Sequence, residues 1–159
     1  ISDLNVWYEE SRRMGTKYYR HIAVSCGGSP TGEGAAAEEC RKRSVLTYLE
    51  RARGVPIDIN HGIRDGRNSA DPVPITQSLR AFNLLAEPQD HFNEEEIEYF
   101  TRQSKVPSSL QSETTDPDYG GLKILYRRQS GNARITVFDG AHDKNTEAAF
   151  RWLNKQRRK

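Results

Sequence analysis

The sequence predicts an α/β protein, because apolar strand patterns alternate along the chain with amphipathic helical patterns. Residues 55–59 place Val and Ile at alternate positions, which is typical of a strand. Residues 122–128 and 133–140 predict two further strands, joined by a polar turn at 129–132. The first strand and the hairpin are each followed by a helical pattern, an order that favours helices layered on a sheet.

The helices are predicted from apolar spacing and from residues that begin or end a helix. Pro74 begins one helix whose apolar residues recur at helical spacing. The last helix is predicted to turn Ala149, Trp152 and Leu153 inward. Residues 18–30 are instead expected to be a short apolar run that ends in a loop. The expected helices are 2–15, which Ser2 caps and Gly15 ends, 31–54 with a break near Arg43–Ser44, 75–86, a short helix that Asn93 caps, and 145–156.

Length and composition limit the classes of protein that the chain can represent. A chain of 159 residues is long enough for a buried core, and we expect the whole of 1–159 to form a single region. Hydrophobic residues make up 35% of it, charged residues 29%, and the net charge is only +2. No basic stripe alternates with aromatic residues, so we expect no nucleic-acid partner. No apolar run reaches ~18 residues, so no contact with a membrane is expected.

The two cysteines, Cys26 and Cys40, lie on either side of a glycine-rich segment, and two interpretations stay open. They can form a disulfide if the protein is exported to an oxidising compartment. Alternatively, they are two small apolar side chains in a core. The sequence therefore leaves the compartment unknown.

Two ionisable side chains follow strands and indicate a chemical site. Asp65 follows the strand at 55–63 in "HGIRDG", and His142 follows the strand at 133–140 in "FDGAHD". If these strands are parallel, both side chains lie at the carboxyl edge of the sheet, where open α/β sheets bind ligands. A carboxylate there can hold one imidazole nitrogen as N–H and leave the other free to accept a serine proton. Taken singly, Asp65 is equally a turn former and His142 a polar residue at a strand end.

The motifs "HGIRDG", "VPITQSLRAFN" and "FDGAHD", with the closing "RWL" helix, together resemble the C-terminal part of an α/β hydrolase. They are most similar to the prolyl-oligopeptidase-like branch of peptidases and esterases. The resemblance covers the whole chain and is strongest at 55–86 and 133–153, although "ISDLNVWYEE" and "CGGSP" also resemble the segment after the nucleophile strand. It implies that Asp65 is the acid and His142 the general base of a serine hydrolase, whose substrate is a peptide or an ester.

The sequence departs from that family most clearly at the nucleophile, because no G-x-S-x-G occurs in it. The nearest segment is "AVSCG" around Ser25, which continues into a glycine-rich stretch instead of a good helix. We therefore predict that the nucleophilic serine and the oxyanion hole lie upstream of Ile1, and that this chain alone is inactive. An insertion-like "GRNSADP" after Asp65 and a valine, Val45, where related proteins often have proline are smaller departures.

Two other functions stay open. A compact hydrolase would use Ser25 as its nucleophile, whereas a non-catalytic α/β module would serve binding or assembly. A hydrolase sheet without its first strands has an exposed edge, so we expect self-association through that edge.

Other ionisable residues compete with the predicted pair. Asp58, Asp71 or Asp139 would each replace the predicted acid if it held His142 instead. Asp58 is expected to face a polar neighbour, and His61 is expected to make a structural hydrogen bond in the acid turn. A zinc site from His61, His142 and the predicted acid lacks any HxxxH or CxxC spacing, so we expect no metal and no cofactor.

Overall fold

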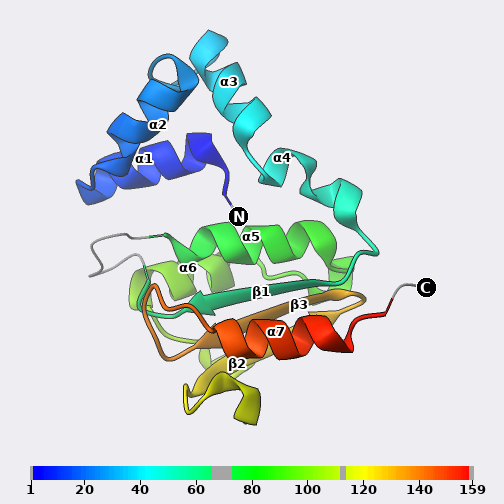
Figure 1. The fold of residues 1–159 in the computed structure, drawn as a ribbon. Helices are drawn as coiled ribbons and strands as arrows, with labels where there is room; N and C mark the ends of the chain where they lie inside the picture. The colour runs from blue at the N-terminus through cyan, green and yellow to red at the C-terminus, as the bar shows by residue number, and fades with distance from the viewer. Residues whose placement is uncertain (1, 66–72, 112–113, 158–159) are drawn as a thin grey trace. The chain divides into compact units, whose positions relative to one another are not determined.

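The computed structural model describes residues 2–65, 73–111 and 114–157 (Figure 1). Within the chain, Ile1–Ala52 and Arg53–Lys159 form two compact units. In the part of the chain that the structure describes, no helix is both long enough and apolar enough to cross a bilayer.

The first unit contains helices and loops in its described part. Its first helix begins after Asp3, whose Oδ1 accepts hydrogen bonds from the backbone N–H groups of Asn5 and Val6. Asp3 is therefore the N-cap, one residue after the predicted Ser2. Gly15 ends this helix in the left-handed conformation, as predicted, with φ of 69°. The helices are α1 (Leu4–Met14), α2 (Tyr18–Cys26), α3 (Ala35–Arg43) and α4 (Leu46–Leu49), followed by the 3₁₀ turn η1 (Glu50–Ala52).

The prediction for residues 18–30 is wrong, because α2 is a helix and not an apolar run that leads into a loop. A disulfide joins Cys26, at the end of α2, to Cys40 on α3, and the two Cα atoms are 5.2 Å apart. Both cysteines lie in a small core with Tyr8 and Ile22. Of the two interpretations that the sequence leaves open, the structure has the disulfide.

The helix expected at 31–54 is interrupted where the sequence predicts a break. Ser44 separates α3 from α4 and is buried. Its Oγ donates to the carbonyl oxygen of Cys40 at 2.7 Å and accepts from the N–H of Leu4 at 2.8 Å. The hydroxyl therefore satisfies a carbonyl at the end of α3 and an N–H at the start of α1, both of which lack a helical partner.

The second unit is built on a three-stranded mixed sheet with the strand order β1–β3–β2. β1 (Ile57–Gly62) runs parallel to β3 (Ala133–Phe138), and β2 (Ile124–Ser130) pairs with β3 in the antiparallel direction. Gly131 makes the hairpin turn with a φ of 52°. The predicted α/β class is confirmed at this level, and the parallel strands β1 and β3 end at the same edge of the sheet.

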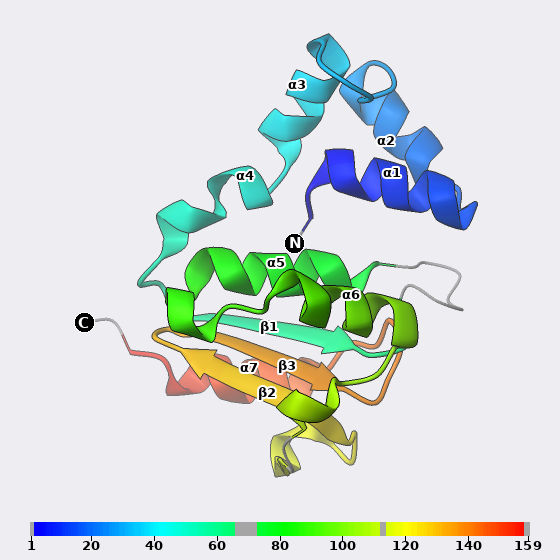
Figure 2. The same cartoon turned by 180° about the vertical axis from the view of Figure 1, so that it is seen from behind.

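Helices cover both faces of this sheet, as two opposite views show (Figures 1 and 2). α5 (Ile75–Leu85) and α6 (Glu94–Gln103) lie on one face, and α7 (Thr146–Lys155) lies on the other. The unit thus has three layers, with the sheet in the middle. Its short 3₁₀ turns are η2 (Pro88–Asp90), η3 (Ser108–Leu110) and η4 (Pro117–Tyr119).

The helices α5 and α6 form where the sequence predicts them. Leu79 and Phe82 on α5 are fully buried, as their spacing predicts. Asn93 caps α6 in a capping box, in which its side chain accepts from the N–H of Glu96 while the Glu96 carboxylate accepts from the N–H of Asn93.

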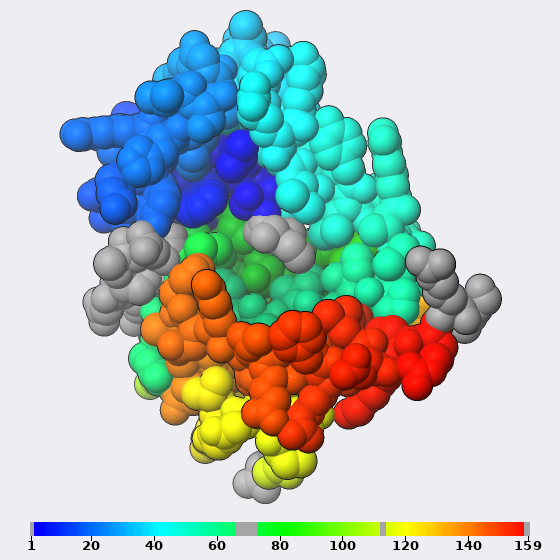
Figure 3. Space-filling view, in the orientation of Figure 1, coloured from blue at the N-terminus to red at the C-terminus, as the bar shows by residue number. Residues whose placement is uncertain are grey.

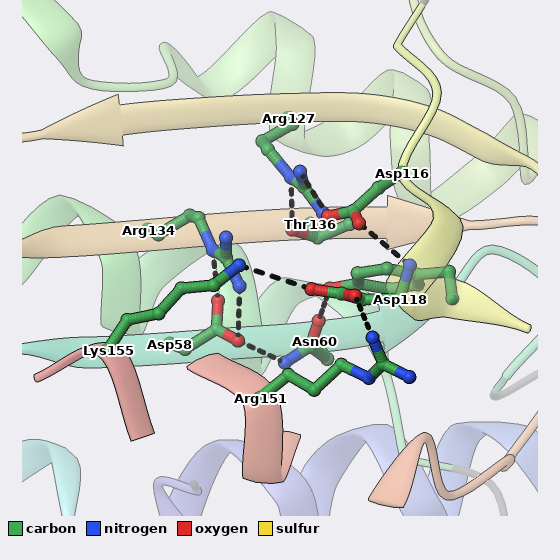
Figure 4. Close-up of polar contacts among 10 residues, drawn as sticks. Asp58, Asn60, Asp116, Asp118, Arg127, Arg134, Thr136, Arg151 and Lys155 are labelled. Carbon is green, nitrogen blue, oxygen red and sulfur yellow. Dashed lines mark hydrogen bonds and ion pairs between the residues drawn. The ribbon is translucent and has the colours of Figure 1, made fainter. Parts of the chain in front are cut away.

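The prediction for the inward face of α7 is wrong at Leu153, which is 55% exposed. Ala149 and Trp152 are half-buried. The sheet face beneath α7 explains this result, because charged and polar side chains cover much of it (Figure 4). Asp58 on β1 accepts two hydrogen bonds from the Arg134 guanidinium on β3, at 2.7 and 2.8 Å. That polar layer leaves little apolar surface for α7 to cover.

Candidate active site

The acid turn begins where β1 ends, and backbone hydrogen bonds join it to the segment after β3. The N–H of Ile63 donates to the carbonyl of Phe138, and the N–H of Arg64 donates to the carbonyl of Gly140, both at 2.9 Å. The N–H of Asp65 then donates to the carbonyl of Gly62 at 2.9 Å, which closes the turn. The two loops that carry the predicted acid and histidine are thus fixed against each other by main-chain contacts.

Asp65 and His142 are in direct contact. Asp65 Oδ2 lies 2.8 Å from His142 Nδ1, and Asp65 Oδ1 accepts the N–H of Val73 at 3.0 Å. A carboxylate accepts hydrogen bonds and does not donate them, so a neutral ring in this contact donates from Nδ1 and keeps Nε2 as its acceptor nitrogen. The contact predicted from the sequence is therefore present.

The two partners differ in their exposure to solvent. The Asp65 side chain is 6% exposed, whereas the His142 side chain is 52% exposed. Figure 3 shows the orange segment after β3, to which His142 belongs, at the surface of the second unit beside α7. No residue in the described ranges makes a hydrogen bond to His142 Nε2 in this structure. The imidazole thus has a fixed side toward the acid and an accessible side toward solvent.

Gly62 permits the close approach of the two loops. A Cβ atom at this position would overlap the carbonyl oxygen of Ala141 and would lie 2.7 Å from the carbonyl carbon of Gly140. This role of Gly62 is not among the predictions from the sequence. The signal was present, because a glycine within a strand pattern often marks a close backbone approach.

The competing carboxylates that the structure describes bind partners other than His142. Asp58 binds Arg134, which confirms that it faces a polar neighbour. Asp139 pairs with Arg64, and Asp143 accepts the N–H of Ala141 at 2.7 Å. The remaining candidate, residue 71, lies outside the described residues.

His61 lies within the same unit and makes a structural hydrogen bond, but its partner is on α5 and not in the acid turn. Its Nδ1 is 2.9 Å from the hydroxyl oxygen of Ser78 on α5. Burial lowers the pKa of His61 to about 4, and the negative charge of Asp65 opposes only part of this change. The ring is therefore neutral at pH 7, and its buried Nε2 has no hydrogen-bond partner in the described part of the chain.

The structure describes Ser25 as a helical residue. It lies in the last turn of α2, and its Oγ donates to the carbonyl of His21 at 2.9 Å. A nucleophile elbow is a sharp turn between a strand and a helix, so Ser25 lacks that local geometry. In the described ranges, no cluster of three or more His, Cys, Asp or Glu side chains is arranged to hold a metal ion.

Comparisons with models of known protein families, with curated proteins and with solved structures found no match to this chain. The class of this protein is therefore described from its fold and its candidate active site alone. It is a small α/β protein whose second unit has a three-stranded mixed sheet, with a carboxylate–imidazole pair at the carboxyl edge of its parallel strands.

Proposed function

We propose that this chain supplies the acid and the general base of a serine hydrolase that cleaves peptide or carboxylic ester bonds. The observation that carries the proposal is the 2.8 Å contact between Asp65 Oδ2 and His142 Nδ1. The chain order, acid before histidine, and the buried acid beside an exposed imidazole support it. The finer assignment, to the C-terminal portion of a prolyl-oligopeptidase-like α/β hydrolase, rests on the sequence motifs and belongs to the same proposal.

The proposed chemistry follows from the two nitrogens of His142. Nε2 accepts the hydroxyl proton of a serine while the serine oxygen bonds to the carbonyl carbon of the substrate. Asp65 keeps the imidazole in the required tautomer and stabilises the imidazolium ion that forms. Nε2 then returns the proton to the leaving amine or alcohol as its bond to the acyl carbon breaks. A water molecule repeats the sequence and releases the carboxylic acid.

The nucleophile is proposed to come from residues outside Ile1–Lys159. Two observations support this part of the proposal. The Ser25 hydroxyl donates within its own helix, and no described hydroxyl group bonds to His142 Nε2. The compact hydrolase that would use Ser25 is therefore the less supported alternative.

The outer edge of β1 supports the idea that a further strand belongs beside it. The N–H groups of Ile57 and Ile63 bond toward β3, at 3.0 and 2.9 Å, and backbone direction alternates along a strand. The backbone groups of Asp58 and Asn60 therefore point to the opposite edge, where no other described strand pairs. An unpaired edge of this kind is a template for another strand.

The same edge favours a second candidate function, a non-catalytic module that assembles with another copy or another chain. Light scattering combined with amide hydrogen exchange separates the possibilities. Self-association through β1 should protect the N–H groups of Asp58 and Asn60 in the oligomer. A monomer at high concentration whose edge amides exchange rapidly would contradict self-association. That result would leave the hydrolase proposal unaffected.

The hydrolase proposal is tested on the isolated chain with an activated ester, p-nitrophenyl acetate, and with a fluorophosphonate probe. Because the chain alone lacks the proposed serine, we expect no enzymatic turnover, only a slow reaction of the ester with the exposed imidazole that is lost in His142→Ala. The matched variant His91→Ala should retain the rate. The fluorophosphonate should leave the chain unlabelled, since it needs an activated serine.

Two results would overturn the proposal. Ester cleavage that is identical in wild type and His142→Ala would contradict the assignment of His142 as the general base. Stoichiometric fluorophosphonate labelling that Ser25→Ala abolishes would instead establish the compact enzyme.

A further inference from the structure

A groove of about 850 Å³ opens at the same edge of the sheet as the Asp65–His142 pair. Its walls include Lys123 and the start of β2, at 124–125, the segment after α6, at 104–108, and the residues Ile63 and Arg64. The volume lies within the range of sites that hold small organic ligands. The carboxyl edge of parallel strands is also where α/β sheets bind ligands.

The groove combines an apolar floor with polar walls. Ile63, Val106 and Ile124 line it and are buried, while Leu125 adds a half-buried aliphatic side chain. Ser104, Ser108, Thr114 and Thr115 contribute hydroxyl groups around this floor. A ligand that fits both surfaces has an apolar body and at least one hydrogen-bonding end.

The charged side chains of the groove are mainly basic. Arg64 is paired with Asp139, which is the acidic residue among the described residues that line the groove. Lys105 and Lys123 are exposed and make no ion pair with any residue in the described ranges. Within the described ranges, the two lysines therefore have no acidic partner beside the apolar floor.

We propose that the groove binds a small organic carboxylate, with its apolar body on the floor and its carboxylate at Lys105 and Lys123. An inorganic anion would satisfy the lysines but would leave the apolar floor exposed, so a carboxylate with an apolar body fits better. The groove adjoins the candidate active site through Arg64, which precedes Asp65 in the chain. The next step rests on the proposed function. The bound carboxylate is then part of the substrate, so the hydrolase acts on anionic esters or amides.

Binding is tested by NMR titration of the whole ¹⁵N-labelled chain with 4-phenylbutyrate, which has an apolar body and a carboxylate. We expect the largest shifts at the amides of Val106, Ile124 and Leu125. The double variant Lys105→Gln/Lys123→Gln should weaken binding at least about tenfold, since charged hydrogen bonds to the ligand are lost. Lys17→Gln is the matched control on the first unit and should bind as the wild type does.

The neutral analogue 4-phenylbutanamide and inorganic phosphate complete the test. Both should bind more weakly than 4-phenylbutyrate, because each lacks one of the two features that the groove recognises. Equal binding of the neutral amide or of phosphate, or unchanged binding in the double variant, would overturn the proposal. His142→Ala should leave binding intact, so failure of the groove and failure of the hydrolase proposal give different results.

Discussion

Asp65 and His142 are adjacent side chains in opposite environments. The acid is buried and accepts hydrogen bonds at both of its oxygens, from His142 and from Val73. The imidazole is half exposed and has one nitrogen oriented toward the acid. Such an arrangement fixes the position of the ring while leaving Nε2 accessible to a reacting group.

The buried His61 should make the free energy of unfolding depend on pH. Burial holds its pKa in the folded protein at about 4, below the ordinary value of 6.5. Between these values the unfolded chain binds a proton that the folded chain excludes, so stability is complete above pH 6.5 and falls as the pH drops toward 4. The free energy of unfolding that is lost through His61 is on the order of 3 kcal/mol.

Urea unfolding of wild type and His61→Gln across this pH range measures the effect. The unfolding free energy of the wild type should fall relative to that of His61→Gln as the pH drops from 6.5 to 4. Parallel pH profiles for the two proteins would show that His61 is not buried in its neutral form.

At the scale of secondary structure, the site depends on how closely the loops after β1 and β3 approach each other. Gly62 is the last residue of β1 and pairs with Phe138, the last residue of β3. The close packing of 62 against 140–141 brings the acid turn and the histidine loop together. Any side chain at 62 forces these loops apart.

Gly62→Ala should therefore destabilise the protein by about 1–3 kcal/mol, the usual cost of overpacking. It should also separate the Asp65 carboxylate from the His142 ring. Thermal unfolding measures the first effect, and the NMR signals of the His142 imidazole report the second. Gly34→Ala is the control, because a Cβ there would meet no atom within 4 Å. A Gly62→Ala protein with wild-type stability and an unchanged His142 signal would contradict the packing argument.

At the scale of the whole molecule, the sequence predicts the second unit better than the first. β1, α5 and the β2–β3 hairpin carry strong apolar periodicities and clear turn residues, so local pattern is enough to find them. α2 was missed because its aromatic and β-branched residues favour a strand and because Lys17 provides no side-chain cap. Propensity there is overridden by burial of Ile22 and Cys26 in the core of the first unit.

The parts of the structure that the sequence left open depend on contacts between distant segments. Whether Cys26 and Cys40 are bridged depends on the distance between two helices, and spacing alone does not determine it. The exposure of Leu153 depends on the polar sheet face beneath α7, which includes Arg134 on another element. The Asp65–His142 contact was predictable because both residues follow strands that proved to be parallel neighbours.

The central claim is that Asp65 sets the tautomer of His142, and ¹⁵N NMR of the imidazole tests it most directly. In the wild type, the neutral ring should carry its hydrogen on Nδ1. In Asp65→Asn, the amide oxygen should keep the Val73 N–H, so that the NH₂ group faces Nδ1 and moves the hydrogen to Nε2. The signals of His21 should not change. A neutral His142 ring with its hydrogen on Nε2 in the wild type, or with the same tautomer in both proteins, would contradict the account.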